Sequence, residues 1–357
     1  MDIESFYFTA SNATEKAFFN VKDTIFRQVC IGGINLQLKF AGEALMPLIM
    51  PAISHLLISS EIIDSEYMIE IWDSESTNSD FPEAPCAIDD IQLRGEIKGL
   101  KSNRYETAFF THAHMLTLLD HDQKKGIICF ADNKNIPAFE LACPLRGLLS
   151  WILRRNNIIM LHAAAVGTAD GCILIGGNSG AGKSSTALRC LVGGLNYLGD
   201  DISAISIKNR IPEVYSIYSS GKSLSKDLPI FPQLFKSLHS HHEEEYEKEI
   251  FFFNTAFDSQ LKERGRLLAV IIPHQNPLLE IGFESLSIAT ALSVIGSSTK
   301  LLLPDAGNEV FHALSTVLHS IPCFQFNLGS NPEKIASTLK QFIANLKIKN
   351  DIDEAGI

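Results

Sequence analysis

A glycine-rich octapeptide in the middle of the chain has the residue types of a phosphate-binding loop. It reads Gly177-Asn178-Ser179-Gly180-Ala181-Gly182-Lys183-Ser184, and Ser185 follows it. The octapeptide matches G-x-x-x-x-G-K-[ST] at every fixed position, and it lies between an apolar segment and an amphipathic one, as that motif requires. Glycines let backbone N–H groups converge on phosphate oxygens, and the start of the next helix adds its positive dipole end. The sequence therefore predicts a nucleoside triphosphate site.

Two side chains of this loop have separate expected roles. Lys183 would reach the β- and γ-phosphates, and the Ser184 hydroxyl would bind Mg²⁺. The alternative is a glycine-rich turn that matches by chance, but strand, loop and helix patterns occur here in the order that the motif needs. We therefore expect ATP and Mg²⁺ as cofactors.

A pair of adjacent acids follows this loop closely. Asp200 and Asp201 come after the apolar segment 197–199, about 17 positions beyond Lys183, so a single short helix separates them from the loop. Two carboxylates at a strand end can divide the work of a phosphotransferase: one binds the metal, directly or through water, and the other takes a proton from an attacking hydroxyl. The alternative is a solvated turn that happens to be acidic.

Together these motifs resemble the catalytic core of the HPr kinase/phosphorylase family. The resemblance is carried by Leu161-His162-Ala163-Ala164-Ala165-Val166, by the glycine-rich loop and by Leu198-Gly199-Asp200-Asp201. The sequence is closer to the divergent HPr-kinase-like group found with peptide biosynthesis clusters, which includes lasso-peptide kinases. The resemblance is specific over about residues 158–207 and vaguer to about residue 345. It implies a phosphoenolpyruvate-carboxykinase-like P-loop fold.

The resemblance also implies roles for individual residues. Lys183 and Ser184 take the phosphate and metal roles, Asp200 would be the general base toward the acceptor hydroxyl, and Asp201 would hold Mg²⁺. The roles of the two acids could be reversed. His162 matches the family's histidine in the preceding strand and would contact Asp200 or the γ-phosphate. A histidine satisfied inside a buried strand is the alternative.

The acceptor is not specified by this resemblance. The stretch after the acid pair has no clear counterpart of the glycine-rich signature of HPr kinases, and the first 140 residues do not resemble their regulatory domain. Neither HPr as the acceptor nor a reverse phosphorylase activity therefore follows from the sequence.

The hydrophobic pattern changes near residue 143. Before it, alternating apolar residues and turn signals predict strands, most of them antiparallel, and one helix weakened by prolines. The expected elements are a hairpin over 29–39, a helix over 44–59, strands over 67–72, 104–110, 115–119 and 127–130, and a loop over 73–80. We expect residues 1–143 to form a mostly β (α+β) domain.

Strands alternate with helices in the second part of the chain. The pattern predicts helices over 144–155, 183–192 and 330–346, and strands over 158–166, 172–176, 267–272 and 323–328. We therefore expect an α/β domain over 144–349, a P-loop kinase domain of the phosphoenolpyruvate-carboxykinase-like kind. A frayed acidic tail is expected over 350–357.

Composition excludes several classes of partner. The 357 residues carry a net charge of -11, without a run of lysines and arginines, and nucleic acids and anionic membranes both require a basic face. The seven cysteines are scattered, with no C-x-x-C pair, and the acidic N-terminus leads into no apolar h-region. We expect a cytoplasmic protein that binds neither nucleic acid nor membrane. The sequence does not decide between a monomer and a homo-oligomer.

Several other residues are weaker candidates. We interpret Lys222, Arg264 and Arg266 as ordinary surface residues; the alternative is that they supply further positive charge to a transferring phosphoryl group. His239, His241 and His242 stand beside Glu243–Glu245, but the segment is polar, and we interpret it as a loop that could cover the acceptor. A metal pair at His112 and His114 is disfavoured, and Phe251–Phe253 predicts a buried strand.

We expect an ATP- and Mg²⁺-dependent kinase that phosphorylates a hydroxyl, in particular serine of a peptide or small protein such as a biosynthetic precursor peptide. The β-rich first domain would hold this acceptor, for example along an edge strand. Three alternatives stay open: a kinase of a small hydroxylated metabolite such as free serine, a nucleotide-gated binding module, and an ATPase coupled to a partner.

Overall fold

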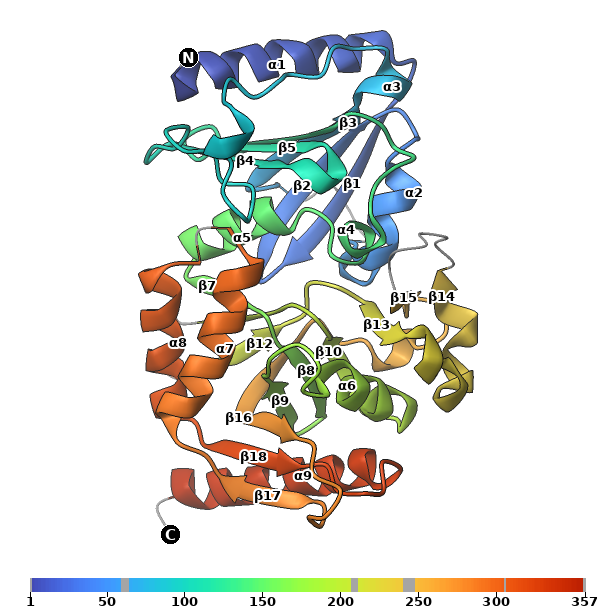
Figure 1. Ribbon diagram of the computed structural model, residues 1–357, viewed down its shortest axis with the longest axis vertical. Coiled ribbons are helices and arrows are strands. Elements are labelled where there is room, and N and C mark those ends of the chain that lie inside the picture. Colours follow the sequence, from blue (N-terminus) through green and yellow to red (C-terminus); the bar gives the residue numbers. More distant parts are fainter. Residues whose placement is uncertain (1, 59–63, 207–210, 240–247, 305, 356–357) are drawn as a thin grey trace. The chain divides into compact units, whose positions relative to one another are not determined.

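The computed structural model describes residues 2–58, 64–206, 211–239, 248–304 and 306–355. The chain forms two compact units, one of Met1–Ile152 with Leu303–Asp305 and one of Leu153–Leu302 with Ala306–Ile357 (Figure 1). The first division lies inside helix α5 (Arg146–Arg155), whereas the sequence placed a domain boundary between residues 143 and 144. That these units are separate functional domains stays a prediction.

The first unit is built on a six-stranded sheet with the order β1-β2-β3-β6-β5-β4. Its strands are β1 (Thr24–Ile31), β2 (Ile34–Ala41), β3 (Tyr67–Asp73), β4 (Tyr105–Phe110), β5 (Met115–Asp120) and β6 (Lys125–Phe130). The predicted strands are confirmed, as is the hairpin, whose turn has positive φ at Gly32 and Gly33. The sheet is mixed rather than antiparallel, because β3 runs parallel to both β2 and β6.

One long helix of this unit was not predicted. Helix α1 (Ile3–Asn20) is capped by Asp2, whose Oδ1 accepts a hydrogen bond from the Ser5 N–H at 2.8 Å. Its buried face recurs at helical spacing and packs on the sheet, where the Trp72 indole N–H donates to the Thr14 hydroxyl at 3.0 Å. The segment is rich in Ser, Thr, Asn and Phe, which are weak helix formers, so packing rather than propensity determines this helix.

The prolines broke the helix that the sequence placed over residues 44–59. Only α2 (Met46–Ile49) is α-helical there, and short 3₁₀ turns follow at Met50–Ala52 and Ser54–Leu56. Proline lacks the N–H that continues a helix. The predicted loop over 73–80 contains the short helix α3 (Ser74–Thr77), and α4 is Ala138–Ala142.

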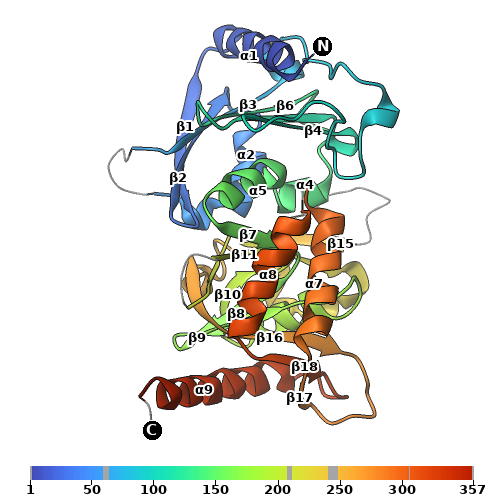
Figure 2. The same ribbon diagram turned by 90° about the vertical axis from the view of Figure 1, so that its left-hand side faces the viewer.

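The second unit contains a nine-stranded sheet (Figure 2). Its main order is β10-β8-β9-β16-β12-β11-β7, with β18 beside β16 and β17 beside β18. The strands are β7 (Ile158–Leu161), β8 (Ala164–Thr168), β9 (Gly171–Ile175), β10 (Asn196–Gly199), β11 (Ser203–Ser206), β12 (Glu213–Tyr215), β16 (Arg264–His274), β17 (Gly282–Ser285) and β18 (Cys323–Asn327).

The strand predicted over residues 158–166 is two strands. β7 ends at Leu161 and β8 begins at Ala164, with only His162 and Ala163 between them. Although they are neighbours in the chain, β7 stands at one end of the strand order and β8 stands next to the other end. Three residue steps span at most about 11 Å, so the sheet must curl until its two ends approach each other.

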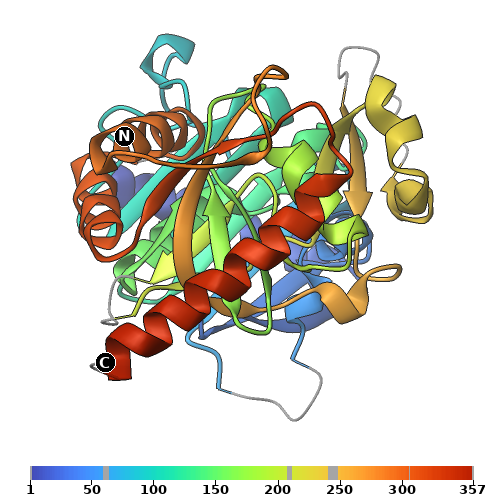
Figure 3. The ribbon, with the colours of Figure 1, turned by 90° about the horizontal axis from the view of Figure 1, so that it is seen from below.

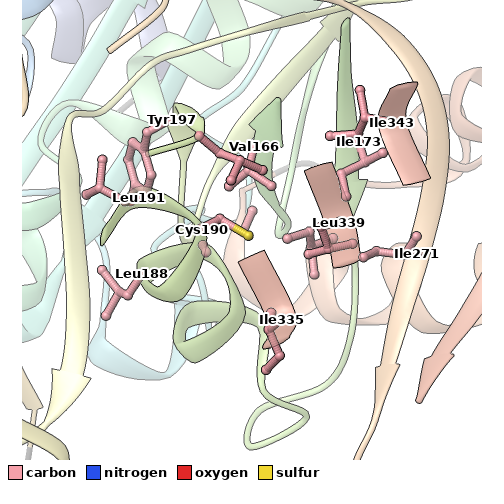
Figure 4. Close-up of a cluster of buried hydrophobic side chains, with 14 of the residues drawn as sticks. Val166, Ile173, Leu188, Cys190, Leu191, Tyr197, Ile271, Ile335, Leu339 and Ile343 are labelled. Carbon is pink, nitrogen blue, oxygen red and sulfur yellow. The ribbon is translucent and has the colours of Figure 1, made fainter. Parts of the chain in front are cut away.

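Helices α6 (Lys183–Val192) and α9 (Lys334–Ala355) share one hydrophobic core with the middle of this sheet. Figure 3 shows α9 running obliquely across the strands, and Figure 4 shows side chains of α6, α9 and the strands meeting in that core. Helix α6 has the predicted bounds. The backbone of α9 continues to Ala355, so residues 350–355 of the tail that we expected to be frayed are helical.

Two more helices, α7 (Ile288–Leu302) and α8 (Asn308–Ser320), pack on each other and on β7. A Cβ on Gly176, directly after β9, would come within 2.4 Å of Ile295 Cγ1, so this glycine lets α7 approach the strand end closely. None of the helices in the described part of the chain combines the length and apolar composition needed to span a bilayer.

A small three-stranded sheet completes the second unit. It consists of β13 (Ser220–Leu224), β15 (Lys248–Phe252) and β14 (Leu238–His239), in the order β13-β15-β14. Phe251, Phe252 and Phe253 are buried, as predicted. 3₁₀ turns at Ser225–Ile230 and Pro232–Ser237 connect β13 to β14.

Candidate active site

The candidate residues gather along one edge of the nine-stranded sheet. Strands β9, β16 and β18 are parallel, and β10 runs in the same direction because β10 and β9 are both antiparallel to β8. The carboxyl ends of these four strands therefore share one edge, which is the usual position of ligand sites in α/β sheets. The glycine-rich loop follows β9, the acid pair follows β10, and His162 directly precedes β8 at the same edge.

The glycine-rich loop has the conformation expected of a phosphate cradle. Gly177, Gly180 and Gly182 have φ values of 150°, 79° and 97°, a region that side chains disfavour. The Lys183 ammonium is folded back over the loop and donates to the Gly177 carbonyl at 2.7 Å and the Asn178 carbonyl at 3.3 Å. Burial lowers the pKa of Lys183, and the charges of Asp201 and Asp200 act in the opposite direction.

A tight turn after β10 presents the acid pair. Gly199 has φ 156°, and a Cβ there would lie 2.9 Å from the Ile202 carbonyl oxygen, so the turn requires glycine. Asp200 is buried, whereas the Asp201 side chain keeps 23% of its surface exposed. The two carboxylates therefore differ in their access to a substrate that arrives from solvent.

Asp200 is buried and incompletely bonded. Its Oδ2 accepts a hydrogen bond from the Lys222 backbone N–H at 3.0 Å, while its Oδ1 has no hydrogen-bond partner among the described residues. Burial, followed by the charge of Asp201, raises the pKa of Asp200 to about 6. The Ser184 hydroxyl lies close enough to act in the opposite direction and lower that pKa, although its geometry does not make a hydrogen bond to Oδ1. A buried carboxylate oxygen next to a hydroxyl is a suitable place for a hard cation.

Asp201 is held on both of its oxygens. Nε2 of His162 lies 3.2 Å from Oδ1, and the Lys222 ammonium donates to Oδ2 at 2.8 Å. Burial alone would raise the pKa of Asp201, but the positive charge of Lys222 and the contact with His162 hold that pKa well below its ordinary value. Asp201 is therefore an ionised carboxylate at neutral pH.

The structure brings His162, Lys183, Ser184 and the two aspartates together, but His162 contacts Asp201 and not Asp200. Lys222 also belongs to this group: it lies in β13 with only 8% of its side chain exposed, so its interpretation as a surface residue is wrong. Arg264 and Arg266 lie at the opposite end of β16 from the edge that carries the loop, beside β12.

Two contacts of the site had no signal in the sequence. The Thr299 hydroxyl of α7 accepts a hydrogen bond from the His162 N–H at 3.0 Å, and the Gln275 amide after β16 donates to the Gly180 carbonyl at 3.0 Å. The partners are 137 and 95 residues apart in the chain. Only the fold brings them together.

The histidine candidates do not form metal sites in the described part of the chain. No group of three or more His, Cys, Asp or Glu residues there could hold a metal ion. His112 contacts Glu140 at 2.8 Å, and His114 packs edge-on against Phe81 and Phe109. His239 packs on Phe252 in the small sheet, while His241, His242 and Glu243–Glu245 lie outside the described residues.

Comparison with known proteins gives little beyond this geometry. No family model and no curated protein matches the sequence. Among solved structures, the Hpr(Ser) kinase/phosphatase from Coxiella burnetii matches with a TM-score of 0.29 and 12% identity, over 54% of this chain and 98% of that chain.

Proposed function

We propose that this protein is an ATP- and Mg²⁺-dependent phosphotransferase that transfers the γ-phosphoryl group to a hydroxyl, in particular the serine hydroxyl of a peptide or small protein. A P-loop kinase domain of the phosphoenolpyruvate-carboxykinase-like kind is part of this proposal. The observation that carries it is the position of two carboxylates beside the phosphate loop: Asp200 next to Ser184, and Asp201 close enough for its charge to act on Lys183.

The residues present fit a bound Mg²⁺. The Ser184 hydroxyl and Asp200 Oδ1, which has no hydrogen-bond partner in the described part of the chain, are hard oxygen donors on one side of the loop. Mg²⁺ in nucleotide sites is usually held by one or two protein oxygens together with phosphates. Bound there, Mg²⁺ would neutralise charge on the phosphate oxygens. Asp201 is less suited to this role, because the Lys222 ammonium already occupies its Oδ2.

These contacts favour the reverse of the roles that the motif resemblance implies for the acid pair. In our proposal Asp200 holds the metal with Ser184, and Asp201 faces the acceptor. Asp201 is ionised, partly exposed and fixed in orientation by His162 and Lys222, which suits a carboxylate that orients an acceptor hydroxyl and accepts its proton.

The proposed reaction is a single displacement. The acceptor oxygen forms a bond to the γ-phosphorus while the bond from that phosphorus to the β,γ-bridging oxygen breaks, and the hydroxyl proton passes to the Asp201 carboxylate. The products are ADP and a phosphate monoester. Lys183, released from the Gly177 and Asn178 carbonyls, would pair with the β- and γ-phosphates, whose charge replaces those two hydrogen bonds.

The proposal is tested by incubating the protein with Mg²⁺, γ-labelled ATP and a panel of acceptors: serine-containing peptides, the small protein HPr and free serine. We expect label on a peptide or protein serine and none on free serine, and loss of transfer in Lys183→Met. Label on free serine alone would assign a metabolite kinase. Phosphate release at the same rate with and without every acceptor would assign an ATPase, and nucleotide binding without turnover a binding module.

A further inference from the structure

The order of strands along the site edge fixes the direction in which a nucleotide would lie. Counting across the sheet, β10 and β8 stand on one side of β9, and β16 and β18 stand on the other. The acid pair and His162 belong to the β10–β8 side, while β9 leads into the phosphate loop. If the γ-phosphate faces the acids, as the proposed function requires, the opposite end of the nucleotide must extend over β16 and β18.

The segment that follows β16 is anchored to the phosphate loop at its beginning. The Gln275 amide donates to the Gly180 carbonyl at 3.0 Å. A Cβ on Gly182 would find Leu328 Cδ1, after β18, at 3.2 Å and Gln275 Nε2 at 3.3 Å. Gln275 and Leu328 therefore form the wall of the phosphate loop on the side away from the acids.

The same segment is anchored again at its end, and it carries an exposed leucine between the two anchors. The Ile281 backbone nitrogen lies 3.0 Å from the position of a Cβ on Gly329, so this end of the segment packs closely on the loop after β18. Between the anchors, the Asn276 side chain accepts a hydrogen bond from the Leu278 N–H at 3.0 Å, and the Asn276 carbonyl accepts one from Leu279 at 3.2 Å. Leu278 is held in a defined turn with 92% of its surface exposed.

We propose that residues 275–281, with Leu328, form the subsite for the base and ribose of the nucleotide. This assignment rests on the proposed function and adds a location to it. Leu278 supplies apolar surface for the base, and Gln275 joins this subsite to the phosphate loop. The occupant is a purine nucleoside rather than a protein surface, because Gln275, at the start of the segment, is hydrogen-bonded to the loop that would hold the phosphates of the same molecule.

The test separates the nucleoside from the phosphates by comparing two ligands, Mg-ATP and Mg-tripolyphosphate, in titration calorimetry. Leu278→Ser should weaken ATP binding about three- to tenfold, since part of a leucine side chain loses its apolar contact, and leave tripolyphosphate binding within twofold. Leu301→Ser is the matched control, an exposed leucine of the same unit on α7, and it should change neither affinity. Because Leu278 is exposed, the substitution leaves the core intact.

The outcomes distinguish this assignment from the proposed function. Unchanged ATP affinity in Leu278→Ser, or an equal loss for ATP and tripolyphosphate, overturns the nucleoside subsite and leaves phosphotransfer standing. Wild-type protein that binds ATP no more tightly than tripolyphosphate also overturns the subsite. Wild-type protein that binds neither ligand overturns both proposals.

Discussion

Asp120 and Asp200 are both withdrawn from water, the first in the six-stranded sheet and the second beside the phosphate loop. Asp120 Oδ1 accepts hydrogen bonds from the backbone N–H groups of Asp122 and Gln123 at 2.9 and 3.1 Å, and the Arg104 guanidinium binds both oxygens. Among the described residues, Asp200 has one backbone donor, and its Oδ1 has no hydrogen-bond partner.

The pKa values of the two groups move in opposite directions for that reason. Burial acts to raise both, but the bonds from Arg104 and the two N–H groups bring the pKa of Asp120 below its ordinary value, whereas the pKa of Asp200 rises to about 6. A carboxylate that only supports the fold accepts all its hydrogen bonds from groups of the chain itself. A buried carboxylate that lacks some of these hydrogen bonds costs stability, and such sites are candidates for ligand binding.

The largest expected effect is a loss of kcat when the acid that faces the acceptor, Asp201, is replaced. Asp201→Asn should lower kcat about 10²- to 10⁴-fold at saturating Mg²⁺ and ATP, because it removes the proton acceptor. Asp120→Asn should leave kcat within twofold. Steady-state transfer to the acceptor found in the labelling screen measures both. If Asp200→Asn caused the kcat loss while Asp201→Asn raised the Mg²⁺ requirement, the two roles would be exchanged.

Asp120→Asn should destabilise the first unit by about 2–3 kcal/mol, the largest loss of stability among the substitutions considered. It breaks a fully bonded carboxylate and removes the buried partner of Arg104, whose other contact, with the exposed Asp122, is longer at 3.5 Å. Denaturant unfolding followed by tryptophan fluorescence reports on this unit, since Trp72 and Trp151 both lie in it. An unfolding midpoint equal to that of the wild type would show that Asp120 is not a structural acid.

Asp200→Asn should change the free energy of unfolding in the opposite direction from Asp120→Asn. Without Mg²⁺ it should stabilise the second unit by about 1–2 kcal/mol, because a buried charge with few hydrogen bonds is removed. With Mg²⁺ it should raise the concentration needed for half-maximal activity about 10- to 100-fold. Calorimetric unfolding in chelator measures the first effect and a Mg²⁺ titration of activity the second. Loss of stability in chelator would contradict the comparison.

The pH dependence of these two stability effects should also differ. The folded-state pKa of Asp200, about 6, lies above the ordinary value of 3.8, so its ionisation destabilises the folded protein. The gain from Asp200→Asn should be complete above pH 6 and fade between pH 6 and 4. The pKa of Asp120 is lowered, so its contribution is present above about pH 4 and is lost as pH falls through its folded-state pKa.

The smallest expected effect concerns an acid with a partner but little burial. Asp170 accepts a bond from Lys347 at 2.9 Å, and the side chains are 35% and 46% exposed. Lys347→Ala should change the free energy of unfolding by no more than about 0.5 kcal/mol, because solvent screens such a pair. A loss above about 1 kcal/mol in denaturant unfolding would mean that an ion pair stabilises the fold even where its side chains are exposed.

Much of the site was predictable because its motifs are local. The phosphate loop, its helix and the acid pair lie within a short stretch of sequence, and each needs particular residue types in consecutive positions. Lys222 was named only as one of several cations. Its burial depends on β13 pairing in a separate small sheet, and no local pattern marks that.

The parts of the fold that the sequence missed depend on distant contacts. Residues 158–166 form a continuous apolar run except for His162, and a single polar residue without a glycine or proline beside it is a weak signal for the end of a strand. At the break, the Thr299 hydroxyl accepts the hydrogen bond of the His162 N–H, so this N–H does not pair with a neighbouring strand. Helix α1 was missed for a related reason, since its buried face is defined by a sheet that forms from residues far along the chain.

The two-residue link between β7 and β8 has a consequence for how the protein behaves in solution. A strand at the end of a sheet offers unpaired backbone groups to other molecules and promotes aggregation. Because the link holds the end of β7 within about 11 Å of the start of β8, the curl limits how freely this end strand can pair with another molecule. Lengthening this link with flexible residues would let the curl relax and would also displace His162 from Asp201, so colloidal stability and catalysis would decline together.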